Sequence, residues 1–167
     1  AAAALGMGID HDLGFPAYFG QVEPAASQTE KAANLIGQGR VLASPMVMAT
    51  VIASVQEGSI VVPRLVSSVE VSPPDVDPLT PGEATALKGM LRGVVTNGSG
   101  RGLLDLPGPD VIAKTGTAEF ARDGRIETHA WMIAAQGDLA VAVFVELGAS
   151  GSRTAGPILE AFLRASR

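Results

Sequence analysis

A lysine, a glycine and two threonines follow a short apolar run, as Lys114-Thr115-Gly116-Thr117 after residues 111–113. Because the residues before them are Val, Ile and Ala, we expect the group to lie on a β-strand. A lysine ammonium and threonine hydroxyls can bind an anion such as a carboxylate through charge-assisted hydrogen bonds. The glycine lets a second backbone come close, and a strand edge can pair with an extended peptide. The backbone amide of Thr117 is also a candidate donor to an oxyanion.

The same residues fit a simpler interpretation as well. An ordinary strand with one exposed lysine and two threonines has this composition, because threonine is common in strands. The tripeptide Lys-Thr-Gly alone does not decide between the two interpretations, so the elements around it matter.

Composition restricts the classes of protein to consider. The chain has 167 residues, of which 47% are hydrophobic and 17% charged, so we expect a folded domain or part of one. The formal net charge of -5, with no clustered lysine and arginine, argues against nucleic-acid binding. Cysteine is absent, which excludes disulfides, thiolate metal sites and a cysteine nucleophile. The uncharged helical stretch at residues 41–56 is too short to span a bilayer.

Helices are predicted where apolar residues recur every three to four positions or a capping signal is present. Residues 1–5 are expected to be the end of a helix that Gly6 terminates. Further helices are expected from the N-cap Ser44 to Gly58, from the capping box Thr80/Glu83 to about Val95, and at residues 157–165. Tight, glycine-dependent backbone is expected at Gly37 and Gly39. Residues 8–30 are expected to form a long loop, with Glu23 and Glu30 in solvent, and residues 151–156 a shorter loop.

Strands are predicted at residues 60–63, 65–71, 111–117, 129–135 and 139–147. Asp123-Gly124 and Gly137-Asp138 separate the last three as hairpin turns would, so these strands should form an antiparallel meander on which the final helix packs. Residues 140–145 are apolar at every position, which predicts burial of both faces.

Several segments together resemble the transpeptidase domains of class B penicillin-binding proteins, in the chain order of that family. These segments are Ile36-Gly37-Gln38-Gly39 with the helix after it, residues 57–66, the helix and glycine turn at residues 89–100, Lys114 to Glu119, His129-Ala130-Trp131, and residues 140–146. The resemblance covers essentially the whole chain. It implies an α/β fold of the α+β type, penicillin-binding/β-lactamase-like, with an antiparallel sheet flanked by helices.

The resemblance also implies an activity. The family consists of serine acyltransferases that cross-link peptidoglycan stem peptides ending in D-Ala-D-Ala, outside the bacterial cytoplasmic membrane, and that β-lactam antibiotics acylate. By resemblance Lys114 and Thr117 would be catalytic, and Thr115, Gly116 and Thr117 would bind the substrate. Glu119, His129 and Trp131 are candidates for a supporting role, although core packing explains the last two equally well. Neither a cofactor nor a metal is implied.

Two motifs of the family are missing from this sequence. No Ser-x-x-Lys and no Ser-x-Asn occurs in it. In the family both motifs precede the position that corresponds to Ala1. We therefore expect residues 1–167 to be the C-terminal portion of one transpeptidase domain, and we expect this portion alone to be inactive. Its sheet would be incomplete, and the strand at residues 139–147 would pair with the missing N-terminal part or with a second copy of the chain. The alternatives are a non-catalytic module for interaction or scaffolding, and a relative of the D,D-carboxypeptidases or β-lactamases.

Asp10-His11-Asp12 is the one group that suggests a metal site. Three adjacent loop residues do not easily point at one ion, and no second cluster of histidine or acidic residues supports them. We therefore predict no metal site.

Overall fold

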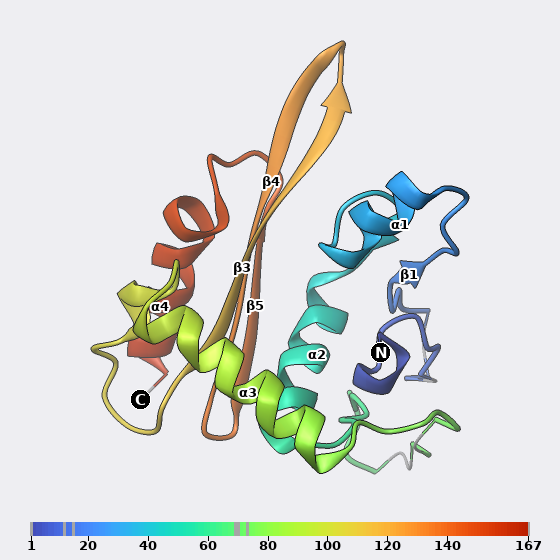
Figure 1. Cartoon of the computed structure of the whole chain (residues 1–167). Helices are drawn as coiled ribbons and strands as arrows, with labels where there is room; N and C mark the ends of the chain where they lie inside the picture. The colour runs from blue at the N-terminus through green and yellow to red at the C-terminus, as the bar shows by residue number, and fades with distance from the viewer. Residues whose placement is uncertain (1, 12, 15, 69–70, 73, 167) are drawn as a thin grey trace. The chain divides into compact units, whose positions relative to one another are not determined.

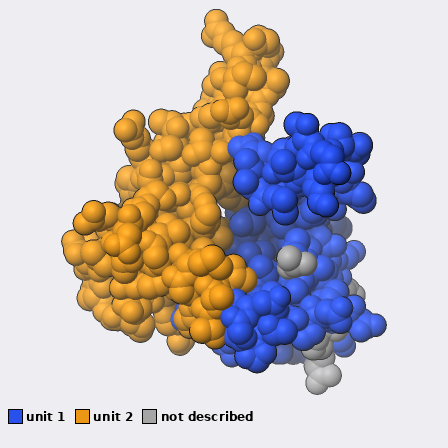
Figure 2. Space-filling model, viewed as in Figure 1, with its two compact units in different colours: residues 1–84 blue, residues 85–167 orange. Residues whose placement is uncertain are grey.

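The computed structural model describes the chain except for residues 1, 12, 15, 69–70, 73 and 167. The chain forms two compact units, residues 1–84 and residues 85–167 (Figure 2). The boundary falls within one helix, α3 (Pro81–Thr96), so the helix begins in the first unit and continues in the second.

The first unit consists mostly of short elements (Figure 1). In chain order these are η1 (Ala3–Leu5), β1 (Gln21–Val22), α1 (Gln28–Leu35), β2 (Val41–Leu42) and α2 (Pro45–Glu57). The two short strands pair antiparallel. Leu13, Phe19 and Val47 form a small buried core.

The predicted helix from Ser44 to Gly58 is confirmed as α2. The Ser44 hydroxyl accepts a hydrogen bond from the Val47 amide, and Pro45 occupies the first turn, where its missing amide costs nothing. Gly58 ends the helix at φ 79°, a conformation that favours glycine. The predicted helix end before Gly6 is confirmed as the single 3₁₀ turn η1, with Gly6 at φ 88°.

The loop predicted at residues 8–30 is wrong in its last part, because α1 begins at Gln28. The Ser27 hydroxyl accepts from the Glu30 amide, and the Glu30 carboxylate accepts from the Ala26 amide. This reciprocal capping is a local helix start signal. The signal is missed at the level of sequence because the glycine, proline and aromatic residues within residues 8–30 indicate one loop.

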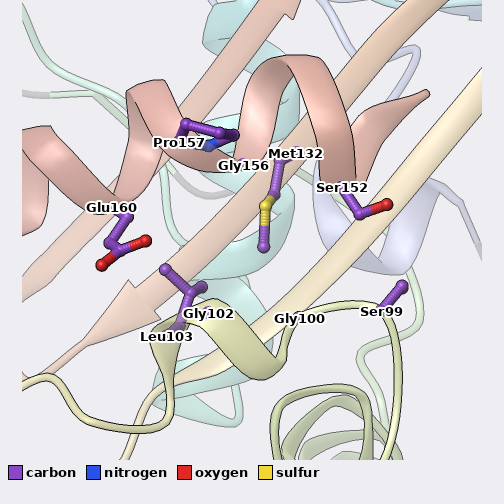
Figure 3. A pocket seen from close by; sticks show the side chains of 9 residues that line it. All are labelled: Ser99, Gly100, Gly102, Leu103, Met132, Ser152, Gly156, Pro157 and Glu160. Atoms are coloured by element: carbon purple, nitrogen blue, oxygen red, sulfur yellow. The ribbon is translucent and has the colours of Figure 1, made fainter. Parts of the chain in front are cut away.

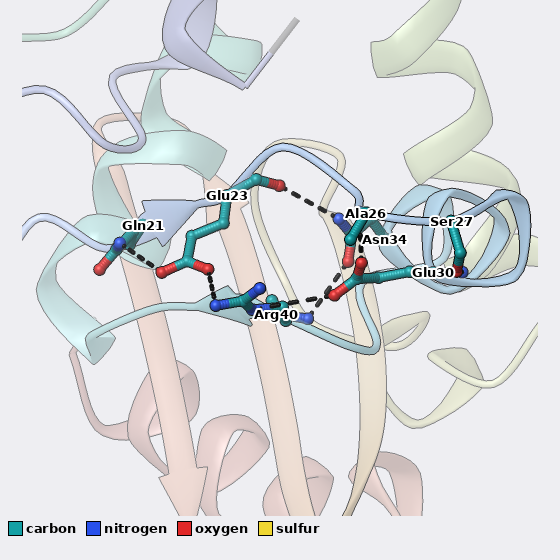
Figure 4. A network of polar contacts seen from close by, with 7 residues as sticks. All are labelled: Gln21, Glu23, Ala26, Ser27, Glu30, Asn34 and Arg40. Carbon is teal, nitrogen blue, oxygen red and sulfur yellow. Dashed lines mark hydrogen bonds and ion pairs between the residues drawn. The ribbon is translucent and has the colours of Figure 1, made fainter.

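Glu23 and Glu30 do not simply face solvent as predicted. Arg40 forms an ion pair with Glu23 and a longer one, 3.8 Å, with Glu30 (Figure 4). Asn34 completes the network: its side-chain amide donates to the Glu23 carbonyl, and its oxygen accepts from the Arg40 amide. These contacts fix the segment around Gly37 and Gly39, whose φ angles of 79° and 74° confirm the predicted glycine-dependent backbone.

The strands predicted at residues 60–63 and 65–71 are wrong for the residues that the structure describes, which form no strand there; Val69 and Glu70 lie outside the described residues. The reason is a competing acceptor. The Val61 amide donates to the buried hydroxyl of Ser54 on α2, at 2.9 Å, instead of to a neighbouring strand. Pro63 has no amide hydrogen to offer a ladder.

The capping box predicted at Thr80 and Glu83 is confirmed at the start of α3. The Glu83 amide donates to the Thr80 hydroxyl, and the Glu83 carboxylate accepts from the Thr80 hydroxyl at 2.7 Å and from the Thr80 amide at 2.8 Å. The pKa of Glu83 is lowered mainly by the hydrogen bond from the Thr80 hydroxyl, and next by the hydrogen bond from the Thr80 amide.

This capping box should make the start of α3 sensitive to acid. Because the pKa of Glu83 is lower in the folded chain, its stabilising contribution is complete above the unfolded pKa and is lost as the pH falls through the folded pKa. Replacing Thr80 with valine removes the hydroxyl, so we expect the pKa of Glu83 to rise. An NMR titration of the Glu83 side chain measures both variants, and an unchanged midpoint in Thr80→Val would contradict this explanation.

The second unit contains the three-stranded sheet in the order β3-β4-β5 (Figure 1). Its elements after α3 are η2 (Arg101–Leu103), β3 (Ile112–Arg122), β4 (Arg125–Gln136), β5 (Leu139–Val145), η3 (Gly151–Ala155) and α4 (Gly156–Ala165). All strand pairs are antiparallel, so the predicted meander is confirmed. Asp123 and Gly124, at φ 50° and 73°, form the two-residue turn that the sequence predicts.

The β3–β4 hairpin is longer than predicted. Its two strands stay paired from Ile112 and Ala135 as far as Arg122 and Arg125, whereas β5 pairs only with residues 130–136 of β4. The hairpin therefore extends beyond β5 as a two-stranded ribbon (Figure 1).

One face of this sheet carries the main core. Met132 and Ala134 of β4 are buried with Leu159 and Leu163 of α4 and with Val95 of α3. This confirms that the final helix packs on the meander. The predicted burial of both faces of residues 140–145 is wrong, because β5 is only partly buried and Phe144 is 37% exposed. The loop predicted at residues 151–156 is also wrong: residues 151–155 form η3, a π-helical turn that leads into α4.

Candidate active site

The Lys-Thr-Gly segment lies on β3, and its register with β4 decides which way the side chains face. Gly116 pairs with Trp131, and Thr115 pairs with Met132, which belongs to the core under α4. Because directly paired residues share a face and successive residues alternate, Thr115 and Thr117 face α4. Lys114 and Gly116 face the opposite side.

Lys114 is exposed, and its ammonium lies close to the strand backbone. The Nζ atom donates to the carbonyl oxygen of Thr115 at 2.6 Å. The positive charge is thus held near the edge of β3. It lies beside Thr115, whose hydroxyl is on the α4 face of the sheet.

Each threonine hydroxyl is held by a residue from another element. The Ser99 hydroxyl, in the turn after α3, lies 2.6 Å from Thr115 Oγ1. The Gly151 amide, at the start of η3, donates to Thr117 Oγ1 at 3.3 Å. The sequence does not identify Ser99 or Gly151 as site residues, because both are far from the Lys-Thr-Gly segment in the sequence and neither belongs to its motif.

At the outer edge of β3, a ligand can reach both the face that carries Lys114 and the face that carries the two threonines. In the sheet formed by the described residues, β3 pairs with β4 on one side and with no strand on the other. A ligand that contacts both the Lys114 ammonium and the threonine hydroxyls must therefore lie along this edge. An edge strand can bind an extended peptide by backbone pairing.

Gly116 lies where other backbone segments come close. A Cβ atom at Gly116 would lie 3.3 Å from Cβ of Trp131, and one at Gly151 would lie 2.7 Å from the Gly116 carbonyl oxygen and 2.9 Å from its nitrogen. The start of η3 thus packs directly on the backbone of the Lys-Thr-Gly segment. No larger residue fits at Gly151 unless this backbone shifts.

His129 and Trp131 share the Lys114 face of the sheet and belong to an aromatic cluster. His129 stacks on Phe120 with ring centroids 3.9 Å apart, and Trp131 packs against Phe144 at 4.4 Å. The Nδ1 atom of His129 lies 2.7 Å from the Glu146 carbonyl oxygen, which ties β4 to the chain after β5. These contacts hold the hairpin in shape beside Gly116 and Ala118, the partners of Trp131 and His129.

Glu119 lies farther along the hairpin, where it is exposed and pairs with Thr128. Arg122, near the hairpin tip, forms an exposed ion pair with Glu146 at 3.2 Å. Glu119 therefore lies five residues beyond Lys114 along β3, toward the hairpin tip.

A cavity of about 230 Å³ lies on the α4 side of the sheet, not on the Lys114 side. Ser99 and Gly100 line one wall, Met132 the sheet, and Ser152 and Glu160 the opposite wall (Figure 3). The cavity borders Ser99, which bonds Thr115, and η3, which bonds Thr117, so it lies behind the two threonines.

Asp10-His11-Asp12 is the group at which the sequence analysis considers a metal site and predicts none. Within the described residues, no three histidine, aspartate or glutamate side chains come together in a way that could hold an ion. His11 is buried edge-on against Phe19, with ring centroids 5.0 Å apart; Asp12 lies outside the described residues. No helix in the described part of the chain has the length and hydropathy needed to cross a membrane.

The family is evident from comparison with known proteins. A family model described as "Penicillin binding protein transpeptidase domain" matches residues 1–164. A search of curated protein sequences gave no match. Many solved structures are similar, which agrees with the sequence resemblance and with the α+β fold.

Three of these structures show how far the similarity extends. PBP2 of Pseudomonas aeruginosa, solved in complex with WCK 5153, is 25% identical with a TM-score of 0.73, over 98% of this chain and 42% of that one. A peptidoglycan synthase complex described as coordinating polymerization and crosslinking contains a chain that is 26% identical with a TM-score of 0.76, over 99% of this chain and 31% of that one. The transpeptidase domain of Burkholderia pseudomallei penicillin-binding protein 3 shares the fold, at 23% identity and a TM-score of 0.73, over 99% of this chain and 56% of that one.

The chain thus spans between about a third and just over half of these neighbours. The similarity runs through the whole chain, including β3 and its Lys-Thr-Gly segment. The resemblance to class B transpeptidases fits these neighbours, and the chain belongs to the penicillin-binding protein transpeptidase domain family.

Proposed function

We propose that this chain is part of a serine D,D-transpeptidase that cross-links peptidoglycan stem peptides at the outer side of the bacterial cell membrane. Both units would be portions of one transpeptidase domain, whose nucleophile-bearing portion carries the Ser-x-x-Lys and Ser-x-Asn motifs that this sequence lacks. The observation that carries the proposal is the Lys-Thr-Gly segment on an edge strand, with its cation and hydroxyls accessible along one edge.

The chemistry follows from the residues that the family motif assigns. The serine oxygen attacks the carbonyl of the penultimate D-Ala, the peptide C–N bond breaks, and the departing D-Ala amine takes a proton. An amine of a second stem peptide then attacks the ester, forming a new amide and returning the proton to the serine. A β-lactam reacts in the same way, with its ring amide bond as the one that breaks.

In this reaction the residues of β3 would bind the donor peptide and stabilise charge. Lys114 attracts the terminal carboxylate of the donor peptide and supports proton transfer at the serine. The hydroxyls of Thr115 and Thr117 donate to the same carboxylate, and the amide of Thr117 donates to the oxyanion. Gly116 leaves room for the peptide backbone along the edge.

The strand β5 supports the division of the domain between two portions. It is apolar throughout, and in the sheet of the described residues only β4 pairs with it. Such an edge favours pairing with another strand. We propose that the nucleophile-bearing portion supplies that strand, or that a second copy of the chain does when this portion is absent.

Labelling with a fluorescent penicillin tests the function. The 167-residue chain alone should not be labelled, because it has no Ser-x-x-Lys. The chain expressed together with the segment encoded upstream of Ala1 should be labelled on the serine of that motif, which mass spectrometry identifies. Labelling of the chain alone would mean that the nucleophile lies within these residues; labelling of neither would favour a non-catalytic interaction module.

A second assay separates the transpeptidase from a D,D-carboxypeptidase or β-lactamase. The labelled protein is given a donor peptide ending in D-Ala-D-Ala together with an amine acceptor. A new amide between donor and acceptor is the transpeptidase product, whereas release of D-Ala without this amide is carboxypeptidase activity, and opening of penicillin with rapid turnover is β-lactamase activity.

A further inference from the structure

The threonine hydroxyls of the Lys-Thr-Gly segment are contacted on the α4 face of the sheet, by Ser99 and by the Gly151 amide. We propose that Ser99 is a positioning residue that directs the Thr115 hydroxyl toward the carboxylate of a bound donor peptide or β-lactam. This inference rests on the proposed function, because it concerns how the same site binds its ligand.

Ser99 stands in a turn whose backbone is fixed by α3. The amides of Gly98 and Gly100 both donate to the Val94 carbonyl, at 3.1 and 2.9 Å. A Cβ atom at Gly98 would lie 2.9 Å from that carbonyl oxygen, so no larger residue fits at position 98 unless the backbone shifts. Val95, next in the helix, is fully buried in the core. The Ser99 hydroxyl is therefore presented to β3 by a rigid support.

The direction of the Ser99–Thr115 hydrogen bond matters for binding. A hydroxyl has a single hydrogen to donate, and an ionised carboxylate can only accept. When Thr115 donates to the carboxylate, it must accept from Ser99, and the 2.6 Å separation allows this. Ser99 then donates to Thr115, and Thr115 donates to the ligand.

Thr117 has a matching support, which makes the arrangement more than a single contact. The Gly151 amide can only donate, so Thr117 Oγ1 accepts from it. Both threonine hydroxyls thus have a polar partner on the α4 side of the sheet, provided by two elements distant in sequence. The sequence motif holds the two hydroxyls, whereas the turn after α3 and the start of η3 orient them.

The test measures acylation in the transpeptidase that contains both portions, with three variants. Ser99→Ala removes the hydroxyl, and Ser99→Thr keeps it, with room for the added methyl because Ser99 is exposed beside the cavity. Ser152→Ala is the matched control: Ser152 lines the same cavity, and its hydroxyl makes a long hydrogen bond, 3.4 Å, to the Ser150 hydroxyl. The probes are a penicillin and its methyl ester, which lacks the carboxylate.

We expect Ser99→Ala to lower the second-order acylation rate constant for penicillin about tenfold, the effect of one weakened hydrogen bond to a charged group. The rate constant for the methyl ester should change less than about twofold, since the ester has no carboxylate for Thr115 to bind. Ser99→Thr should restore the rate with penicillin, and Ser152→Ala should leave both rates unchanged. Thermal unfolding followed by circular dichroism checks that the variants are folded.

Two results would overturn this inference. An equal loss with penicillin and with the ester would mean that Ser99 only maintains the structure, and an unchanged rate with penicillin would mean that it does not orient Thr115. The unmutated protein separates these results from failure of the proposed function: if penicillin does not acylate it, the proposed function itself is wrong, and this inference with it.

Discussion

Replacing Lys114 with alanine should lower the rate of penicillin acylation about 100- to 1,000-fold in the proposed transpeptidase that contains both portions. The reason is electrostatic: the Lys114 ammonium is the only charged group among residues 111–118, and it lies at the edge of β3 where we propose that the ligand binds. Losses of this size are typical when one group that stabilises developing charge is removed from a site. The measurement is the second-order rate constant for acylation, determined with a fluorescent penicillin.

Lys88→Ala is the matched control for this prediction. It removes the same charge from an exposed position on α3, within the same unit of the chain. We expect its acylation rate to stay within about twofold of the unmutated protein, because Lys88 is exposed to solvent on α3 and lies outside the Lys-Thr-Gly segment. If both variants lost activity equally, net charge and not the position of Lys114 would be responsible.

Replacing Leu159 with alanine should destabilise the second unit by about 2–5 kcal/mol, the usual cost of truncating a fully buried leucine. Leu159 is 0% exposed and packs in the core that joins α4 to β4 and α3. Removing it leaves a cavity between the helix and the sheet that carries the Lys-Thr-Gly segment. Trp131, the only tryptophan, lies on this sheet, so its fluorescence during urea denaturation measures the change.

Ile158→Ala provides the comparison for Leu159→Ala. It shortens a β-branched apolar residue at the adjacent helix position, where the side chain is 51% exposed. We expect a change below about 0.5 kcal/mol, as for surface substitutions in general. Equal losses in the two variants would mean that α4 does not pack on the sheet through its Leu159 face.

The elements that the sequence predicts correctly are those with local signals. Ser44 with Pro45, and Thr80 with Glu83, specify helix starts through contacts within four residues. Asp123-Gly124 specifies the hairpin because both residues adopt the positive φ angles that its turn requires. The errors occur where a distant residue takes over a backbone group, as when Ser54 binds the Val61 amide and prevents a strand.

The sequence by itself determines the family, the Lys-Thr-Gly strand and the alternation that separates Lys114 from Thr115 and Thr117, because motif and strand period are properties of neighbouring residues. Only the tertiary structure brings Ser99 and Gly151 behind the threonines. These residues lie 16 and 34 positions away from their partners, so no local pattern relates them. They come together because α3 and α4 pack in one core against the sheet, and this packing depends on the whole unit.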